Sequence, residues 1–450
     1  MVRLRGAEKV KSTPQVVEWF LSLHPFWQAL VRVLLWIGPL FLILPVLIWF
    51  ERRLLAWFQD RIGPNRVGTI TFSKRNEKLP SFLRGRKISL FGLMQSFADI
   101  TKAMLKEDIT PTAVDKFLFV IAPGLFLFPA FLLGATVPWG PIRALTPVAD
   151  INIGVLFLLA ASSLGVYGVV LAGYSSNNKY SLLGGLRSTA QLISYELSMT
   201  VSLAGIALAT GDLKFTRFVE AQQQGLWGFD SGLANWFIFT PYGFVAAIVF
   251  GICMIAETNR PPFDLPEAEN ELVAGYNTEY TAKKWVLFMM GEYLGMLTYS
   301  AVFATVFLGG WHIVPIRWDW VAEHIPALAW PANAFAALEA NFAPIWFLLK
   351  MSVGICIYIW IRATLPRLRY DQLMNLGWRT LLPIATTNLI VIATWMVVSR
   401  VWGAWAGVLA FAISAGLAYV LYRSVNKLAP GQKGNFESRT ITMVEPEVVV

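Results

Sequence analysis

The chain has 450 residues, of which 56% are hydrophobic and only 14% are charged, and its formal net charge is +9. Soluble domains carry about 25% charged residues, so the composition excludes an ordinary soluble fold and favours a helical protein that crosses a membrane several times. The basic residues lie in loops that flank apolar spans, which is the pattern of membrane topology and not of a nucleic-acid partner.

Nine apolar stretches are candidate membrane spans, because each approaches the roughly 20 residues that a helix needs to cross the hydrocarbon core. The fifth stretch is short and almost nothing separates the last two, so eight spans is the alternative. The first stretch is too long for the apolar part of a signal peptide and has no small-residue cleavage site. The nine stretches are residues 27–50, 117–137, 152–173, 189–209, 241–256, 285–309, 344–361, 380–398 and 401–422.

We therefore expect an all-α fold, a polytopic membrane helical bundle in a single membrane domain over residues 1–450. The bundle occupies 27–422, between an N-terminal extension at 1–26 and a C-terminal tail at 423–450, and it contains an acidic cytoplasmic loop at 257–284. The spans show none of the inverted symmetry that many secondary transporters carry.

The distribution of lysine and arginine predicts the orientation. Alternate loops hold most of the basic residues, which predicts an outside N-terminus and a cytoplasmic C-terminus. Arg3, Arg5, Lys9 and Lys11 precede the first span and argue for the opposite orientation, but the basic load just after that span is larger. The basic loops are 51–116, 174–188, 257–284 and 362–379, followed by the tail after 422.

The first basic loop contains a helical pattern. Gln95 and Asp99 recur at helical spacing on a polar face, while Phe97 and Ile100 occupy another face. This pattern predicts an amphipathic helix within 90–106 that lies at the cytoplasmic membrane surface.

Cysteine and histidine give little indication of a metal site. Cys253 and Cys356 lie in apolar spans, and the chain has no C-x-x-C motif. We therefore expect neither an iron–sulfur cluster nor a zinc site in this chain. His24, His312 and His324 are scattered in outer segments and are interpreted as structural or solvated.

The most informative segment is AETNRPPFDLPEAENELVAGYNTEY, in which six carboxylates have Arg260 as their only basic neighbour. Acidic groups crowded at a membrane edge repel one another, titrate as a coupled unit and can exchange protons when a nearby charge changes. A capping box of Asp264 and Glu267 would explain those two as the start of a helix. Capping does not explain the others, so we favour a functional role for the group. The six are Glu257, Asp264, Glu267, Glu269, Glu271 and Glu279.

Two further carboxylates lie inside predicted spans, Glu196 in the fourth and Glu292 in the sixth. A charged side chain near the bilayer centre costs at least about 2.5 kcal/mol even on insertion scales, so it is by default a candidate functional residue. The alternative is a neutral glutamic acid whose hydrogen bonds only hold helices together. We favour the functional interpretation.

Two basic clusters end spans on the cytoplasmic side. The first reads ERRLLAWFQDRIGPNRVG and begins at Glu51, and the second reads IWIRATLPRLRYDQLMNLGW and contains Arg362, Arg367 and Arg369. Arginine at a span end is an ordinary topology signal, so the clusters alone do not indicate a site.

Four more blocks join these two in chain order, and the six together resemble the H subunit of NADH:quinone oxidoreductase, respiratory complex I, over roughly residues 40–400. The resemblance implies a membrane subunit that forms the quinone chamber and couples quinone reduction to proton translocation in the bacterial inner membrane. It implies an enzyme only as part of that complex. The other four blocks are GLMQSFADITKAMLKED, KYSLLGGLRSTAQLISYE, the acidic segment and GEYLGMLTYSAVFATVFLGGW.

The resemblance also implies which residues take part. Proton coupling is expected from Glu196, Glu257, Asp264, Glu267, Glu269, Glu271, Glu279 and Glu292. The quinone chamber and its charged path are expected to include Glu51, Arg52, Asp99, Lys102, Arg362, Arg367 and Arg369.

Quinone is the implied substrate, and we expect this chain alone to bind no cofactor. Iron–sulfur clusters and the NADH site are expected on peripheral-arm partner subunits, and antiporter-like membrane subunits and the lipid bilayer are further partners. The chain departs from the family pattern in a basic insertion at 69–90 and in a tail without an assigned role. The alternatives are the homologous membrane subunit of a hydrogenase or formate hydrogenlyase complex, a stand-alone ion transporter and a passive structural anchor.

Overall fold

The structure is a computed structural model. It describes residues 19, 20, 22–68, 70–71, 87–88, 90–141, 148–264 and 273–403, and a few positions between 405 and 416. The chain divides into two compact units, Met1–Leu389 and Ile390–Val450. The site described below lies entirely within the first unit.

Among the described residues, seven helices are long and apolar enough to cross a membrane, and α8 (Pro241–Glu257) is a shorter apolar helix of 17 residues. The predicted all-α membrane bundle is confirmed, and each of the first eight predicted spans coincides with one of these helices. The ninth, 401–422, lies almost entirely outside the described residues. The seven are α2 (Pro25–Phe58), α4 (Lys116–Leu133) with η1 (Gly134–Thr136), α5 (Gly154–Ser175), α6 (Lys179–Thr210), α10 (Ala282–Phe307), α13 (Ala343–Thr364), and the run of α14 (Tyr370–Asn375), the π-helix η6 (Leu376–Leu381) and α15 (Leu382–Trp402).

Short elements occupy the connections. The predicted amphipathic helix is present as α3 (Gln95–Leu105). Strands β1 (Ile70–Thr71) and β2 (Lys87–Ile88) pair antiparallel at the two ends of the insertion, whose interior lies outside the described residues. The other short helices are α7 (Phe215–Gln222), α11 (Trp318–His324) and α12 (Ala329–Asn341), with single turns η2 (Leu226–Gly228), η3 (Phe237–Phe239), η4 (Gly275–Asn277) and η5 (Pro326–Leu328).

Polar caps determine where two of the spans begin. Asp115 accepts hydrogen bonds from the backbone N–H groups of Phe117 and Leu118, at 3.1 and 3.2 Å, and so starts α4. Asn178 accepts one from the N–H of Tyr180 at 3.0 Å and starts α6 directly after α5 ends. These bonds satisfy N–H groups that have no partner within the helix. The short connection makes α5 and α6 antiparallel neighbours.

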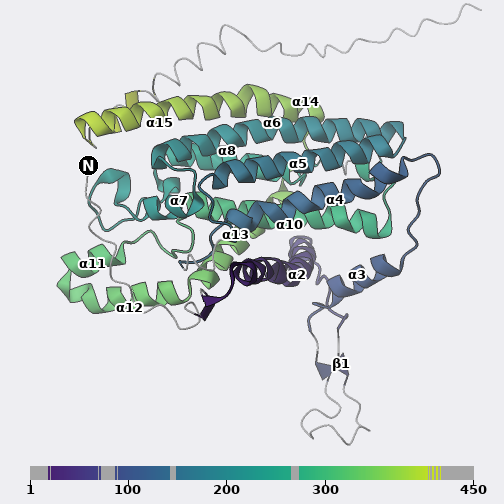
Figure 1. The fold of residues 1–450 in the computed structure, drawn as a ribbon, viewed down its shortest axis with the longest axis horizontal. Coiled ribbons are helices and arrows are strands. Elements are labelled where there is room, and N and C mark those ends of the chain that lie inside the picture. The colour runs from purple at the N-terminus through teal and green to yellow at the C-terminus, as the bar shows by residue number, and fades with distance from the viewer. Residues whose placement is uncertain are drawn as a thin grey trace, which may run out of the picture. The chain divides into compact units, whose positions relative to one another are not determined.

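Helices α4, α5, α6, α8 and α10 form the centre of the first unit and lie side by side (Figure 1). Figure 1 views α2 nearly along its axis, so this helix crosses the others steeply. It contacts α3, α10 and α13. The buried Ser96 hydroxyl of α3 donates to the carbonyl oxygen of Pro45 at 2.7 Å and ties α3 to α2.

Close packing holds the segment that follows the acidic stretch. A Cβ atom on Gly184 of α6 would lie 2.5 Å from the Cα of Gly275, so η4 packs directly on the α6 backbone. The Tyr280 ring stacks on Phe119 of α4 with ring centroids 4.1 Å apart, and it packs edge-on against Phe288 of α10 at 5.1 Å. Burial raises the pKa of Tyr280 to about 12, so its phenol stays neutral.

Replacing Gly184 by alanine is expected to destabilise the protein by about 1–3 kcal/mol, the usual cost of overfilling a packed position. The new Cβ would overlap the backbone of Gly275, which cannot swing aside as a side chain can. Gly124→Ala in α4 is the matched control, because a Cβ there meets no atom within 4 Å. The midpoint of thermal unfolding in detergent is measured for both variants. Equal midpoints for Gly184→Ala and Gly124→Ala would refute the packing argument.

Candidate functional site

Arg260, in the loop after α8, lies between two buried carboxylates. Its Nη1 is 4.0 Å from Oε1 of Glu51 on α2, and its Nη2 is 3.7 Å from Oε2 of Glu292 on α10. Arg362 on α13 also donates a hydrogen bond to Oε1 of Glu51. Glu51, Arg260 and Glu292 are each only 3–4% exposed. Two carboxylates and two guanidinium groups thus form one charge-balanced cluster that joins four segments distant in sequence.

Burial makes the members of this cluster interdependent. Taking a charged group out of water costs several kcal/mol unless opposite charges and hydrogen bonds replace the lost hydration. The Arg260 guanidinium lies over the ring of Tyr293, 4.3 Å from its centroid, and the Tyr276 hydroxyl donates to Oε1 of Glu292 over 3.4 Å. Two unit charges 4 Å apart interact by about 4 kcal/mol at an effective dielectric constant of about 20. A change of charge on one member is therefore felt by the others.

A cavity of about 210 Å³ opens beside this cluster, between α2, α3 and α10. Most of its wall is apolar, with side chains such as Met289, and its charged part is an ion pair in which Nη1 of Arg52 lies 2.5 Å from Oδ2 of Asp99. Tyr293, the ring that lies against Arg260, is also part of the wall. The cavity and the charge cluster therefore share one side chain.

Helix α10 separates this cavity from a second, smaller one. Met289 and Tyr293 are four residues apart and line the larger cavity, whereas Glu292, Gly295 and Tyr299 follow at spacings of three and four and line the smaller cavity. Residues three or four apart share one face of a helix. The helix thus presents one stripe of side chains to each cavity.

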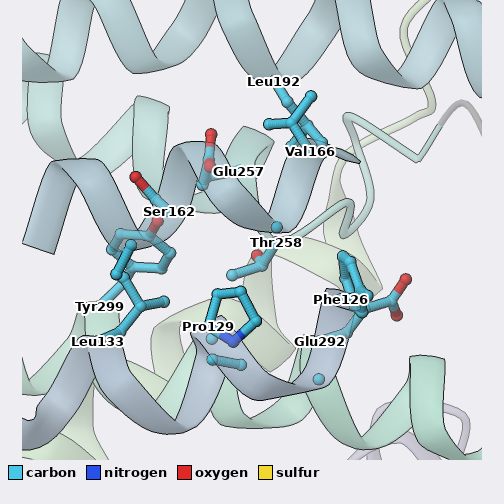
Figure 2. Close-up of a pocket in the computed structure, with 15 residues that line it drawn as sticks. Phe126, Pro129, Leu133, Ser162, Val166, Leu192, Glu257, Thr258, Glu292 and Tyr299 are labelled. Atoms are coloured by element: carbon cyan, nitrogen blue, oxygen red, sulfur yellow. The ribbon is translucent and has the colours of Figure 1, made fainter. Parts of the chain in front are cut away.

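The smaller cavity, of about 50 Å³, lies beside Glu292 and two half-buried carboxylates, Glu257 and Glu196 (Figure 2). Glu257 and Ser162 line it, and Oε1 of Glu196 accepts hydrogen bonds from the hydroxyls of Ser162 and Ser163, at 2.8 and 2.6 Å. Glu257 interacts electrostatically with Glu196, and its side chain also interacts with Tyr299. One water molecule needs about 10–15 Å³, so this cavity has room for a few.

Asp264 forms a further ion pair, with a partner that is half exposed. Its Oδ2 lies 3.4 Å from Nη2 of Arg367, and its side chain is fully buried. The N–H of Leu368 donates to the carbonyl of Pro262 at 3.0 Å, which fastens the connection between α13 and α14 to the loop after α8. Gln191 of α6 joins this loop to the end of α8, because its Nε2 donates to the backbone carbonyls of Ala256 in α8 and Phe263 in the loop, at 2.8 Å each.

Most of the predicted site residues that the structure describes belong to these groups. Glu279 lies apart from them and accepts a hydrogen bond from Nδ2 of Asn178 at 2.7 Å. Within the described part of the chain, no ion pair or side-chain hydrogen bond joins Lys102 or Arg369 to them. The predicted residues outside the description are Glu267, Glu269 and Glu271. Those within the groups are Glu51, Arg52, Asp99, Glu196, Glu257, Asp264, Glu292, Arg362 and Arg367.

Sequence reasoning missed the uncharged members of the site, Ser162, Tyr293 and Tyr299. Tyr299 follows Glu292 by seven residues, which places both on the same helix face, so helical spacing from Glu292 is a signal that finds it. Tyr293 is the next residue after Glu292 and lies on a different helix face, so helical spacing from Glu292 does not find it. No comparable signal marks Ser162, which lies in a span without a charged residue.

The histidines make local contacts outside these groups. Nδ1 of His312 lies 3.4 Å from Oε1 of Glu339, and the ring of His324 stacks on Trp320 with centroids 4.2 Å apart. Within the described ranges, no group of three or more histidine, cysteine, aspartate or glutamate side chains could hold a metal ion.

Comparisons with known proteins identify the family. The family model described as NADH dehydrogenase matches residues 31–393. The H subunit of the Frankia alni NADH-quinone oxidoreductase is 40% identical over 383 residues, which cover 84% of this chain and 74% of the relative. The H subunit of the Protochlamydia amoebophila enzyme is 43% identical over 352 residues, 77% of this chain and 90% of the relative. An H subunit of the Koribacter versatilis enzyme, the one numbered 2, is 40% identical over 381 residues, 81% of this chain and 96% of the relative. The resemblance of the six sequence blocks is thereby confirmed, and this multi-pass membrane chain belongs to the NADH dehydrogenase family, as a relative of the H subunit of NADH-quinone oxidoreductase.

Proposed function

We propose that the chain is the membrane subunit of a proton-translocating NADH-quinone oxidoreductase, that it forms the quinone-binding chamber, and that it couples quinone reduction to proton translocation. One observation carries this proposal: Tyr293 lines the larger apolar cavity and also lies against Arg260 of the charge cluster. A change of charge in the cavity therefore acts directly on buried ionised groups. The names of the relatives support the enzyme class.

The larger cavity has the properties that a quinone requires. Ligand sites are mostly apolar and contain a few placed polar groups that orient the ligand. Here the apolar wall suits an isoprenoid tail, while the pair of Arg52 and Asp99 and the Tyr293 hydroxyl offer hydrogen bonds to a head group. Because α2 and α10 are candidate spans, we infer that quinone reaches the cavity from the bilayer. We assign the NADH site and the iron–sulfur clusters that supply electrons to peripheral-arm subunits.

Quinone reduction would change the charge beside the cluster. Two electrons convert a quinone into a dianion, and two protons are needed to complete the quinol. Until protons arrive, the negative charge beside Tyr293 attracts Arg260 away from Glu51 and Glu292. A buried carboxylate that loses its cation binds a proton, because an unpaired buried charge is costly. The proton taken up at Glu292 then has a path through the smaller cavity to Glu257.

The other predicted residues extend this path in the proposal. We assign the acidic segment to the same coupled set of carboxylates, which passes changes in protonation toward antiporter-like membrane subunits. We assign Lys102 to the chamber wall and Arg369 to the charged path beside it. We place the complex in the bacterial inner membrane, with the N-terminus outside and the C-terminus in the cytoplasm. The carboxylates of the acidic segment are Glu257, Asp264, Glu267, Glu269, Glu271 and Glu279.

Filling the larger cavity is expected to weaken quinone binding without disturbing electron input. Ala103 of α3 lines the cavity, so Ala103→Phe places an aromatic ring inside it. Ala98→Phe is the matched control, because Ala98 lies on the same helix with its side chain exposed. We expect the KM for a long-tailed quinone to rise about tenfold, or about 1.4 kcal/mol. NADH oxidation with a water-soluble acceptor should not change. An unchanged quinone KM in an assembled Ala103→Phe complex would show that quinone binds elsewhere.

Neutralising Glu292 tests the charge cluster. Glu292→Gln leaves Arg260 with one neighbouring carboxylate and removes a proton acceptor. We expect quinone reduction and proton pumping to fall at least about tenfold, equivalent to about 1.4 kcal/mol of barrier, in a complex that still assembles on native gels. Glu323→Gln, on the exposed side of α11, is the matched control and should behave as wild type. Wild-type rates in the assembled Glu292→Gln complex would make the cluster structural only.

The proposed orientation predicts which connections reach the outside. Asp230, between α7 and α8, has a side chain that is 71% exposed, and Asp371 of α14 is exposed on a connection that we place in the cytoplasm. In a background with Cys253 and Cys356 replaced by alanine, a membrane-impermeant thiol reagent added to spheroplasts is expected to label Asp230→Cys. It should label Asp371→Cys only after the membrane is opened. The reverse labelling pattern would show that the chain has the opposite orientation in the membrane.

A further inference from the structure

Four side chains from four helices meet beside the smaller cavity: Glu257 of α8, Tyr299 of α10, Ser162 of α5 and Glu196 of α6. The Ser162 hydroxyl donates to Oε1 of Glu196 at 2.8 Å. The Tyr299 hydroxyl interacts with the side chains of Ser162 and Glu257, and all three residues line the cavity. Figure 2 shows Glu257, Ser162 and Tyr299 around the same cavity. The four groups thus follow one another in the order carboxyl, hydroxyl, hydroxyl and carboxyl.

We propose that the hydroxyl groups of Tyr299 and Ser162 relay a proton between Glu257 and Glu196. This inference rests on the proposed function and deepens it, because it assigns one step of the coupling path to two uncharged side chains. A hydroxyl group both donates and accepts hydrogen bonds, so it passes a proton on without holding a charge itself. Acidic residues alone are therefore not the whole path.

The transfer conserves atoms and charge. With Glu257 protonated and Glu196 ionised, Glu257 donates to Tyr299, Tyr299 donates to Ser162, and Ser162 donates to Glu196. Each hydroxyl then loses its own proton to the next group and gains one from the group before it. Glu257 ends ionised and Glu196 ends protonated, with the hydrogen bonds reversed. Rotation of the two hydroxyl groups restores the original direction of the hydrogen bonds. No group is oxidised or reduced.

The two hydroxyl groups of the relay belong to buried residues. Tyr299 is 2% exposed and Ser162 is 6% exposed. The cavity beside them extends to Thr258 and Glu292. Oε2 of Glu257 is buried and has no hydrogen-bond partner among the described residues, although Glu257 lines the cavity. A water molecule in the cavity would satisfy that oxygen and would connect Glu292 to the start of the relay.

The Ser162 hydroxyl has two acceptors for its one proton. Besides Glu196, the backbone carbonyl of Leu159 lies 2.8 Å away, and a bond to such a carbonyl is ordinary for a serine within a helix. Rotation between the two acceptors is the motion that the relay needs for its reset. A serine with a structural role only would keep one of these bonds throughout turnover.

The test uses the assembled complex in sealed vesicles and measures protons pumped per NADH oxidised. Tyr299→Phe removes a hydroxyl and keeps the ring. We expect the quinone KM and assembly to stay as in wild type, while pumping falls at least about tenfold, in line with the loss of a positioned proton-transfer group. Tyr242→Phe is the matched control, because Tyr242 is also buried and its hydroxyl interacts with Thr240 and Asn235, which are uncharged. It should pump as wild type.

Two variants of Ser162 make the test independent of Tyr299. Ser162→Ala is expected to lower pumping in the same way, and Ser162→Thr is expected to restore it, because threonine keeps the hydroxyl. If the Tyr299→Phe complex does not assemble, the two Ser162 variants test the relay by themselves. Equal pumping by the alanine and threonine variants would overturn the relay.

Two glutamine variants separate this inference from the proposed function. Both the proposed function and the relay predict that Glu257→Gln and Glu196→Gln block pumping. If they block it while Tyr299→Phe and Ser162→Ala pump as wild type, the relay is wrong and the proposed function stands. If the glutamine variants also pump as wild type in assembled complexes, coupling through these carboxylates is wrong, and the relay fails with it.

Discussion

The position of Arg260 between Glu51 and Glu292 is the constraint on which the rest of the site depends. A guanidinium group and two carboxylates, each almost fully removed from water, are stable only together, because an unpaired buried charge costs several kcal/mol. Arg362 supplies the second positive charge that balances the cluster. Helices α2, α10 and α13 must therefore meet at one place, and the loop after α8 must enter between them.

Helix α10 makes this cluster a junction between two different environments. Glu292 and Tyr293 are neighbours in sequence and so point about 100° apart around the helix. Glu292 faces the smaller cavity, which is lined by carboxyl and hydroxyl groups, and Tyr293 faces the larger apolar cavity. An apolar substrate and a proton path can thus lie on opposite sides of one helix without mixing. The contact between Tyr293 and Arg260 is the connection across that partition.

The helices of this protein could be predicted from sequence because each membrane span is a continuous apolar run, and even the shortness of α8 is visible there. Carboxylates stand out in such runs, which is why Glu196 and Glu292 could be selected. Their partners could not be predicted. Glu51 and Arg362 are 311 residues apart. The sequence suggests that Arg260 balances the carboxylates of its own loop, but it pairs with Glu51 and Glu292 on two other segments. The packing of the helices determines which groups meet, and the local sequence does not show that packing.

The anchoring of the acidic segment has a consequence for its length. Before residues 265–272, Asp264 is held by Arg367, and after them Gly275 packs against Gly184 with no space between the backbones. The chain between these two anchors must always bridge the same gap. Added residues lengthen the chain between the anchors, whereas each deleted residue shortens its maximum reach by up to about 3.5 Å. Deletions therefore strain the two anchors sooner than insertions do, so this segment should tolerate insertions better than losses.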